Sequence, residues 1–409
     1  MGVGIEAIHP YGGRAAIDIR TLFQARRLDL SRFDNLMMQR KSVNLPCEDP
    51  VTNAVNAARP IVARLTEAEK ARIELVIAAS ESGVDFGKSM GSYIHHYLGL
   101  SRKCRQFEIK QACYAGTAGL QMAASWLAAG LSPGATALII ATDVANAAAK
   151  HTYAEPSQGT GAAAMLVSAN PRTLTLDLGA NGYHSYEVMD TCRPAVRLET
   201  GDPDLSLLSY LDCLEHSFAD YAGRTGADFQ QTFDYLAFHT PFAGMVKGAH
   251  RMMMRRLKRM GPAEANADFE RRVVPSLAYC TEIGNIYSAT VFLALCGLVD
   301  HGDFSSPRRV GLFSYGSGCA SEFFSGVLTR QSQDALRALR IGEALAGRHR
   351  LTMEEYDALL DQADEAGFGV QNADLDPVRY SRIYSEQFDG RGLLVLRRIR
   401  DFHREYEWS

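Results

Sequence analysis

The feature that most constrains the fold of this chain is a regular alternation of short apolar runs with helical patterns. Each run is followed by a turn and then by a helix-like stretch, which is typical of an α/β architecture. The strand-like runs cover residues 75–79, 107–110, 137–142, 235–238 and 310–315. At 409 residues the chain exceeds one small core, so we expect two or three units or one large pseudo-symmetric one.

Apolar composition also predicts several helices. Residues 115–129 are rich in Ala, Leu and Met and end at Gly130, which is typical of a buried helix with a glycine cap. A second apolar helix is expected over residues 288–299. Towards the C-terminus we expect a helix over 353–366 and a charged amphipathic segment over 394–406. We expect this last part to be peripheral and to carry no chemistry.

The chain shows no linker, low-complexity tract or short repeat that would mark a domain boundary. A division into halves must therefore fall in the irregular stretch around residues 165–205. We predict an N-terminal half over residues 1–170 and a C-terminal half over 171–409, the latter ending in peripheral helices.

Composition excludes several classes of protein. Hydrophobic residues make up 46% and charged residues 22%, and no apolar run reaches the ~18 residues of a membrane span, so we expect a soluble protein. The first residues do not resemble a secretory signal, which makes the cytoplasm the expected location. A net charge of -4 argues against nucleic-acid binding. The eight cysteines lack paired spacing, so neither a metal site nor a disulfide framework is expected.

Cys113 is the strongest candidate for a nucleophile. It follows a strand-like run and opens an apolar helix, where free backbone N–H groups and the helix dipole stabilise a thiolate. Gly116 and small neighbours at 115, 117 and 118 leave room for a substrate. A buried structural thiol is the alternative interpretation.

Polar residues at other strand ends are further candidates. Glu81 is a possible acid or base, and His239 follows another strand-like run; a solvated glutamate and a structural histidine are the alternatives. Asn285 precedes the second apolar helix, as a helix cap or as a substrate contact. Backbone N–H groups of Gly316 and Ser317 can form part of an oxyanion hole, although this short motif is weak by itself.

One segment is strongly basic. Lys247 is followed by Arg251, Arg255 and Arg256, with methionines between them. A solvated helix face is one interpretation, and docking of an acidic carrier helix or a phosphopantetheine arm is the other.

Several separated segments, taken together, resemble the 3-hydroxy-3-methylglutaryl-CoA (HMG-CoA) synthases. They are ESG at 81–83, QACYAGTAG at 111–119, YAEPSQGTG at 153–161, AFHTPFAG at 237–244, GNIYSAT at 284–290 and YGSG at 315–318. The branch that acts in polyketide β-branching is the most similar one, because VGIEAI, NLMMQRKSV, EDPVTNAVNAA and EVMDTCRP also match it. The likeness extends from about residue 3 to Trp408.

The resemblance implies a thiolase-like fold with layers in the order αβαβα, a homodimer and an acyltransferase that needs no metal or redox cofactor. It implies that Cys113 carries an acetyl group, that Glu81 is the acid and base, and that His239 positions or protonates the acceptor carbonyl. Asn285 would bind the acceptor, and the N–H groups of Cys113 and Ser317 would bind the thioester oxyanion. The remaining substrate contacts would be Tyr153, Gly316 and Lys247, and the docking residues would be Arg251, Arg255 and Arg256.

One departure bears on the substrate. CoA-dependent members tend to carry a lysine shortly after the catalytic histidine, where this chain has Phe242, Ala243 and Gly244. The glycine-containing version favours a donor and an acceptor bound to acyl carrier proteins. A CoA-dependent synthase of primary metabolism and a decarboxylating ketoacyl synthase are the enzymatic alternatives, and Glu81 argues against the second. A silent scaffold is the third alternative, but the candidate nucleophile, base and histidine are all present.

Overall fold

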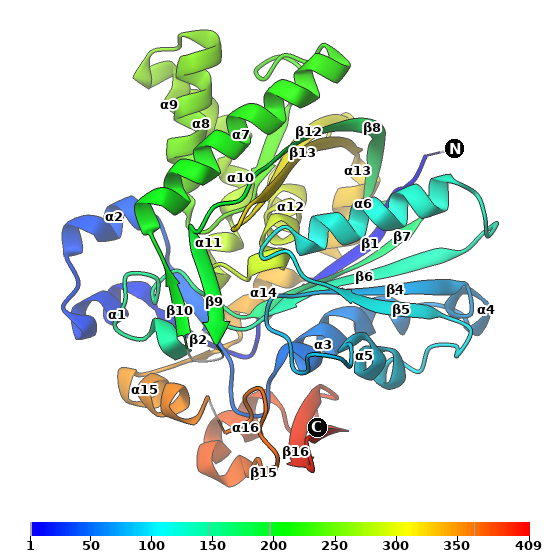
Figure 1. Ribbon diagram of the computed structural model, residues 1–409, viewed down its shortest axis with the longest axis vertical. Coiled ribbons are helices and arrows are strands. Elements are labelled where there is room, and N and C mark those ends of the chain that lie inside the picture. Colours follow the sequence, from blue (N-terminus) through cyan, green and yellow to red (C-terminus); the bar gives the residue numbers. More distant parts are fainter. Residues whose placement is uncertain (1, 146, 196–197, 364) are drawn as a thin grey trace.

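One large mixed sheet runs through the computed structural model, which describes residues 2–145, 147–195, 198–363 and 365–409 (Figure 1). In these residues the strand order is β11-β12-β13-β8-β1-β7-β6-β4-β5. The strands are β1 (Gly4–Tyr11), β4 (Ile73–Ala79), β5 (Arg105–Ile109), β6 (Thr136–Asp143), β7 (Gly161–Ser168), β8 (Leu174–Ser185), β11 (Tyr235–Phe238), β12 (Arg308–Gly316) and β13 (Ala320–Leu328). All five predicted strands are therefore present.

The two parts of the sheet repeat one topology. β1, β7, β6 and β4 are neighbours in that order, with two antiparallel pairings followed by a parallel one. β8, β13, β12 and β11 repeat this pattern, and β1 joins β8 through two residue pairs. The predicted division after residue 170 falls between the end of β7 and the start of β8. The division into domains itself stays a prediction.

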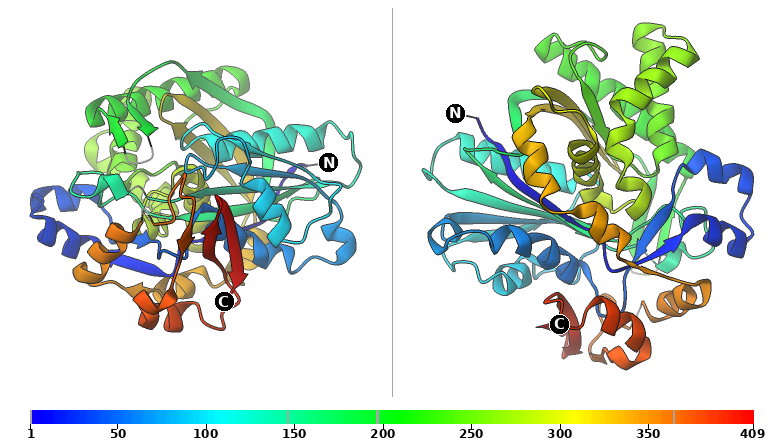
Figure 2. Two further views of the ribbon diagram at one scale, coloured as in Figure 1. Left: turned by 60° about the horizontal axis from the view of Figure 1, so that its bottom comes forward. Right: turned by 180° about the vertical axis from the view of Figure 1, so that it is seen from behind.

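Helices form an outer layer on each side and a central layer between the two parts of the sheet (Figures 1 and 2). The central helices, α6 and α12, share one core cluster with strands of both parts. α3 and α5 pack in a second cluster against β4, β6 and β7, and α7 and α8 pack in a third against β11, β12 and β13. Their bounds are α3 (Pro50–Val62), α5 (Gly91–Tyr97), α6 (Ala115–Ala128), α7 (Pro203–Thr225), α8 (Ala243–Lys258) and α12 (Thr290–His301).

The alternation of side chains along a strand explains these layers. In β4, Leu75 and Ile77 lie in the central core, whereas Val76 and Ala78 lie in the core beneath α3. Both faces of the strand are buried over residues 75–79, which is why this part of it is a continuous apolar run. The expected order αβαβα agrees with this arrangement.

The two predicted apolar helices form the central layer. α6 begins at Ala115 and is followed by Gly130, whose φ of +67° is the left-handed conformation expected after a helix end. The second helix is α12, preceded by a short 3-10 turn over Tyr287–Ala289. A Cβ on Gly116 would lie 2.6 Å from the carbonyl oxygen of Ser288, so glycine lets α6 approach this turn closely.

The C-terminal segment differs from the prediction in one respect. The expected helix over 353–366 is α15 (Met353–Gln362), with residue 364 outside the described residues, but 394–406 forms a β-hairpin of β16 (Leu394–Arg400) and β17 (His403–Trp408). Leu394 and Leu396 pack against the α3 core while Val395 packs on the other face, so the apolar period is two. The predicted peripheral helix was wrong here because the segment is covered on both faces.

Smaller elements connect these layers. They are β2 (Ala15–Asp18), α1 (Ile19–Arg26), α2 (Phe33–Leu36), β3 (Arg40–Val43), α4 (Glu67–Lys70), β9 (Thr191–Ala195), β10 (Leu198–Gly201), α9 (Pro262–Arg272), α10 (Val274–Leu277), α11 (Cys280–Ile283), α13 (Arg330–Arg337), α14 (Ile341–Ala346), β14 (His349–Arg350), β15 (Ala373–Asp374) and α16 (Ser381–Gln387). Among the helices of the described residues, none combines the length and apolar character needed to cross a membrane.

Candidate active site

A cavity of about 1890 Å³ opens where the carboxyl ends of the strands of both halves meet. Parallel strands end at one edge of a sheet, and loops at that edge are a common place for ligands. Glu81 follows β4, Cys113 follows β5, His239 follows β11 and Ser317 follows β12. All four line the cavity, together with Asn285. The structure therefore brings together the predicted catalytic residues from both halves.

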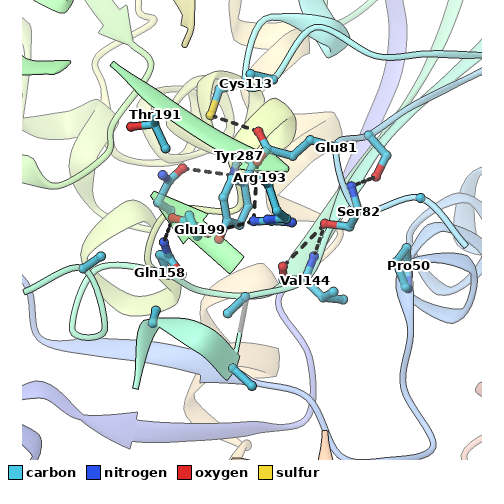
Figure 3. Close-up of a pocket in the computed structure, with 18 of the residues that line it drawn as sticks. Pro50, Glu81, Ser82, Cys113, Val144, Gln158, Thr191, Arg193, Glu199 and Tyr287 are labelled. Atoms are coloured by element: carbon cyan, nitrogen blue, oxygen red, sulfur yellow. Dashed lines mark hydrogen bonds and ion pairs between the residues drawn. The ribbon is translucent and has the colours of Figure 1, made fainter. Parts of the chain in front are cut away.

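Cys113 and Glu81 are in direct contact. The thiol of Cys113 donates to Oε2 of Glu81 at 3.8 Å, immediately before α6 begins (Figure 3). Burial, followed by the nearby carboxylates of Glu81 and Asp143, raises the pKa of the Cys113 thiol. Burial therefore opposes the ionised thiolate that the position at the start of α6 favours. Cys113 instead needs a neighbouring base to take its proton as it attacks.

Asp143, the last residue of β6, holds the loop that carries Glu81. Its Oδ1 accepts from the backbone N–H groups of Glu81 and Ser82 at 2.9 and 3.1 Å, and its Oδ2 accepts from the hydroxyl of Ser288 at 2.8 Å. Burial, and then the charge of Asp143, raises the pKa of Glu81 to about 8. A carboxyl group with such a pKa exchanges protons near neutrality, as an acid and base must.

A partly buried arginine also lies beside Glu81. Nη2 of Arg193, on β9, lies 3.5 Å from Oε1 of Glu81 and 3.1 Å from Oε2 of Glu199, on β10. Its guanidinium lies 5.7 Å from the ring centroid of Tyr287. The sequence alone does not indicate Asp143, Arg193, Glu199 or Tyr287 as site residues. Matching family motifs contain Arg193 and Tyr287, but no local pattern shows that the strands carrying Arg193 and Glu199 reach Glu81.

His239 lies on the wall contributed by the C-terminal half. Its N–H donates to the carbonyl of Phe313 at 2.7 Å, and its own carbonyl accepts from the hydroxyl of Tyr210 at 2.7 Å. Burial lowers the pKa of the imidazole to about 3, so the ring is neutral at physiological pH. Nδ1 is buried and has no hydrogen-bond partner among the described residues. A neutral imidazole can donate one hydrogen bond and accept another.

The turn that carries Ser317 lies against the loop that carries Cys113. A Cβ on Gly316 would lie 2.5 Å from the carbonyl oxygen of Gln111 and 2.6 Å from the N–H of Tyr114. This close approach requires glycine. The arrangement places two backbone segments beside each other at the nucleophile, as an oxyanion site needs.

Asn285 combines the two interpretations that the sequence left open. Its side-chain oxygen accepts from the N–H of Tyr287 and from the hydroxyl of Thr290, each at 2.9 Å, so it caps the turn before α12. The residue also lines the cavity. Its contact with a substrate stays a prediction.

The other predicted site residues lie farther out. Tyr153 is 63% exposed at the cavity, with the guanidinium of Arg32 at 4.6 Å from its ring centroid. Lys247 does not line the described cavity, and its ammonium lies over the ring of Phe269. The predicted docking residues Arg251, Arg255 and Arg256 are exposed on α8, and Arg256 pairs with Glu215. They also lie outside the cavity lining.

The C-terminal segment, from which we expect no chemistry, contributes to the wall of the cavity. Leu359 and Gln362 from α15, Gly367 and Phe368 after it, and Arg404 from β17 line the cavity wall. Its residues are therefore part of the site, although none of them contacts Cys113.

Comparison with known proteins gives the family. Two family models match, the hydroxymethylglutaryl-coenzyme A synthase N-terminal region over residues 50–172 and its C-terminal region over 255–375. The chain is 51% identical to the polyketide biosynthesis 3-hydroxy-3-methylglutaryl-ACP synthase PksG of Bacillus subtilis, over 100% of this chain and 99% of that protein. It is 33% identical to the hydroxymethylglutaryl-CoA synthase of Enterococcus faecalis, over 93% and 97%.

A solved structure agrees with this relationship. The HMG synthase of the curacin biosynthetic pathway, crystallised in complex with acetyl donor-ACP, superposes with a TM-score of 0.97 at 56% identity and covers 100% of both chains. The predicted thiolase-like fold is thereby confirmed. The chain belongs to the hydroxymethylglutaryl-CoA synthase family of condensing enzymes.

Proposed function

We propose that the protein condenses an acetyl group with the β-ketone of a polyketide intermediate on an acyl carrier protein, which creates a β-carboxymethyl branch. The observation that carries this proposal is the contact between a buried thiol and a carboxyl group of raised pKa in a large cavity. Two relatives support carrier-protein substrates. The one of 51% identity is named as an ACP synthase of polyketide biosynthesis, and the one of 56% identity was crystallised with acetyl donor-ACP.

The residues of the cavity support each step of this chemistry. Cys113 attacks the acetyl thioester, the carrier thiol leaves, and a thioester to Cys113 remains. Glu81 then removes a methyl proton, and the resulting enolate attacks the acceptor ketone. His239 donates a hydrogen bond to the oxygen that develops charge, while the backbone at Ser317 holds the thioester oxyanion. Hydrolysis of the thioester frees the carboxylate and the Cys113 thiol.

Mass spectrometry of the intact protein tests the donor and the nucleophile. We expect acetyl-carrier protein to add one acetyl group and acetyl-CoA to do so far more slowly, and Cys113→Ala to abolish this labelling. Cys296→Ala is the matched control, because this thiol is also buried and has a raised pKa but lies outside the cavity. Equal use of acetyl-CoA would favour the CoA-dependent synthase, and labelling of another cysteine would contradict the assignment.

Docking of the donor carrier is proposed to use the exposed cations of α8. Among the described acidic residues none pairs with Arg251 or Arg255, and Arg256 pairs only with Glu215. Since carrier proteins usually present an acidic helix, these charges would accelerate encounter in a salt-dependent way.

Charge reversal tests this surface. We expect Arg255→Glu with Arg256→Glu to slow transfer from acetyl-carrier protein on the order of tenfold at low salt. Transfer from acetyl-pantetheine should remain unchanged. Arg330→Glu with Arg340→Glu is the matched control, because these two arginines are also exposed but belong to a different surface. Equal loss with both donors would show that the stretch is structural.

A homodimer is proposed across the edge of the sheet at β5. This strand ends the sheet, and an edge strand offers unpaired backbone groups to another chain. α6 packs beside it and exposes Met122. Light scattering should give about twice the 44.9 kDa of one chain, and a mass of one chain would contradict the proposal. The eight free cysteines are compatible with the expected cytoplasmic location, which is a proposal as well.

A further inference from the structure

The β9–β10 hairpin places one cation between two carboxylates at the site of proton transfer. Arg193 contacts Glu81 on one side and Glu199 on the other through the same nitrogen, Nη2 (Figure 3). Glu81 comes from the loop after β4, more than a hundred residues earlier in the chain. Arg193 and Glu81 each keep 20% of their side-chain surface exposed, so water screens the pair only in part.

The hairpin and its neighbours fix this arrangement. Nε2 of Gln158 donates to the second oxygen of Glu199 at 2.8 Å, which orients that carboxylate towards Arg193. The ring of Tyr287 lies beside the guanidinium. Nε of Arg193 is buried without a hydrogen-bond partner among the described residues. Among the described residues Arg193 thus donates a hydrogen bond to Glu199 and forms an ion pair with Glu81, and no other hydrogen bond ties its side chain to the fold.

We propose that Arg193 and Glu199 are positioning residues that act on Glu81: Arg193 holds its carboxylate beside Cys113 and favours its ionised form, while Glu199 competes for the same cation. This inference rests on the proposed function of Glu81 as the base. Neither residue is proposed to touch the reacting atoms.

The balance of charge around Glu81 gives the two residues opposite effects. The charges of Asp143 from β6 and Glu199 from β10 disfavour a negative charge on Glu81, whereas the hydrogen bond from the Cys113 thiol before α6 favours it. The Tyr287 hydroxyl faces the same group of charges. Arg193 is the cation that faces Glu81 among the described residues. Loss of Arg193 therefore raises the pKa of Glu81, whereas loss of the charge on Glu199 lowers it.

The two states of Glu81 use the cation differently. While Glu81 is ionised and acts as the base, Arg193 is shared between the two carboxylates. Once Glu81 has taken the methyl proton, it is neutral and Arg193 is available to Glu199 alone. The pair therefore keeps the charge of the cation compensated in both states, without movement of the hairpin.

The pH dependence of condensation tests this inference. Enzyme acetylated at Cys113 is mixed with a β-ketoacyl-carrier protein, because acetylation removes the thiol from the titration. The wild-type rate should increase with pH through a pKa of about 8. Arg193→Gln should shift this increase to higher pH and Glu199→Gln to lower pH, each on the order of 1 unit.

Two further variants serve as controls. Arg193→Lys keeps one positive charge beside Glu81 and should restore the wild-type pH profile, although it cannot contact both carboxylates in the same way. Arg172→Gln removes a surface cation that pairs with Glu6, outside the cavity, and should leave the profile unchanged. Shifts of Arg193→Gln and Glu199→Gln in the same direction, or no shift in either, would overturn the inference.

A second measurement does not require turnover. The rate at which iodoacetamide alkylates Cys113 depends on how readily Glu81 takes the thiol proton. We expect alkylation at pH 7 to be slower in Arg193→Gln and faster in Glu199→Gln, as measured by intact mass. If these shifts occur but the wild-type protein does not condense acetyl groups, the proposed function fails and the positioning pair stands. If condensation occurs without either set of shifts, the positioning pair fails.

Discussion

At the scale of single residues, the site depends on how burial changes ordinary side chains. Desolvation raises the pKa of both Cys113 and Glu81, and it keeps His239 neutral by lowering the pKa of its ring. The thiol proton therefore has a nearby acceptor, and the imidazole is available as a neutral hydrogen-bond donor. The chemistry therefore depends on which of these three side chains carries a proton.

Replacement of the base tests this distribution of roles. Glu81→Gln removes the proton acceptor on which both steps depend, so acetylation of Cys113 should slow, and condensation by enzyme already acetylated at Cys113 should fall by roughly 10²–10⁴. Exchange of the acetyl methyl hydrogens in D₂O, followed by mass spectrometry, should also be lost. Glu74→Gln is the control, because this carboxyl lies on β4, the strand that leads to Glu81, but outside the cavity. A wild-type rate of condensation in acetylated Glu81→Gln would contradict this role.

At the scale of secondary-structure elements, the site depends on how closely the turn after β12 approaches the start of α6. Gly316 is the contact point, and its missing side chain is what allows Ser317 to lie beside the Cys113 loop. The approach also depends on Tyr114, whose hydroxyl donates to Glu322 on β13 at 2.7 Å. The two elements are thereby tied together on both sides of the turn.

A methyl group at position 316 should push the turn after β12 away from the start of α6. Gly316→Ala places a Cβ against backbone atoms that cannot move independently, so we expect the rate of Cys113 acetylation to fall on the order of 10²-fold, as for the loss of an oxyanion donor. Gly223→Ala is the matched control, since this exposed glycine in α7 has open space around it and alanine should stabilise the helix by about 0.5–1 kcal/mol. An acetylation rate in Gly316→Ala equal to that of the wild type would contradict the proposed role of the turn.

At the scale of the whole molecule, the C-terminal hairpin of β16 and β17 packs against α3. Arg404 of β17 and Asp49, which caps α3, form an ion pair of 3.1 Å with 6% exposure on each side, and the hydroxyl of Tyr406 also donates to Asp49 at 2.8 Å. Asn56 of α3 exchanges hydrogen bonds with the backbone of Leu394. Arg404 lines the cavity as well, so the hairpin links the stability of the fold to the site.

Removal of this buried cation should destabilise the protein. Arg404→Met leaves the carboxylate of Asp49 buried without its ion-pair partner, which costs about 3–5 kcal/mol in comparable pairs and should lower the melting temperature by several degrees. Arg398→Met is the control on the same hairpin. Its pair with Glu405 is exposed, with 49% and 36% of the side-chain surfaces accessible, so the change should stay below about 1 kcal/mol. Equal melting temperatures for the two variants would show that the buried pair is not a structural link.

The sequence by itself determined five strands of the large sheet and the two central helices, because each of these depends on local composition. The run before Glu81 and the helix after Cys113 are mostly apolar, and such stretches can be recognised in the sequence without knowledge of tertiary contacts. The sequence did not reveal the hairpin at residues 394–406. A charged amphipathic segment is compatible with the period of a helix or of a strand as long as the surface that packs against it is unknown.

Only the tertiary structure decided which charges surround Glu81. Asp143 comes from β6, and Arg193 and Glu199 come from the neighbouring strands β9 and β10, all far along the chain from Glu81. Their effect on its pKa depends on distances of a few ångströms and on burial. The same is true of Cys113, because burial raises the pKa of a thiol whose helix position alone would lower it. Local sequence fixes where a functional residue stands along its strand, whereas its protonation depends on neighbours that the packing of the two halves brings to it.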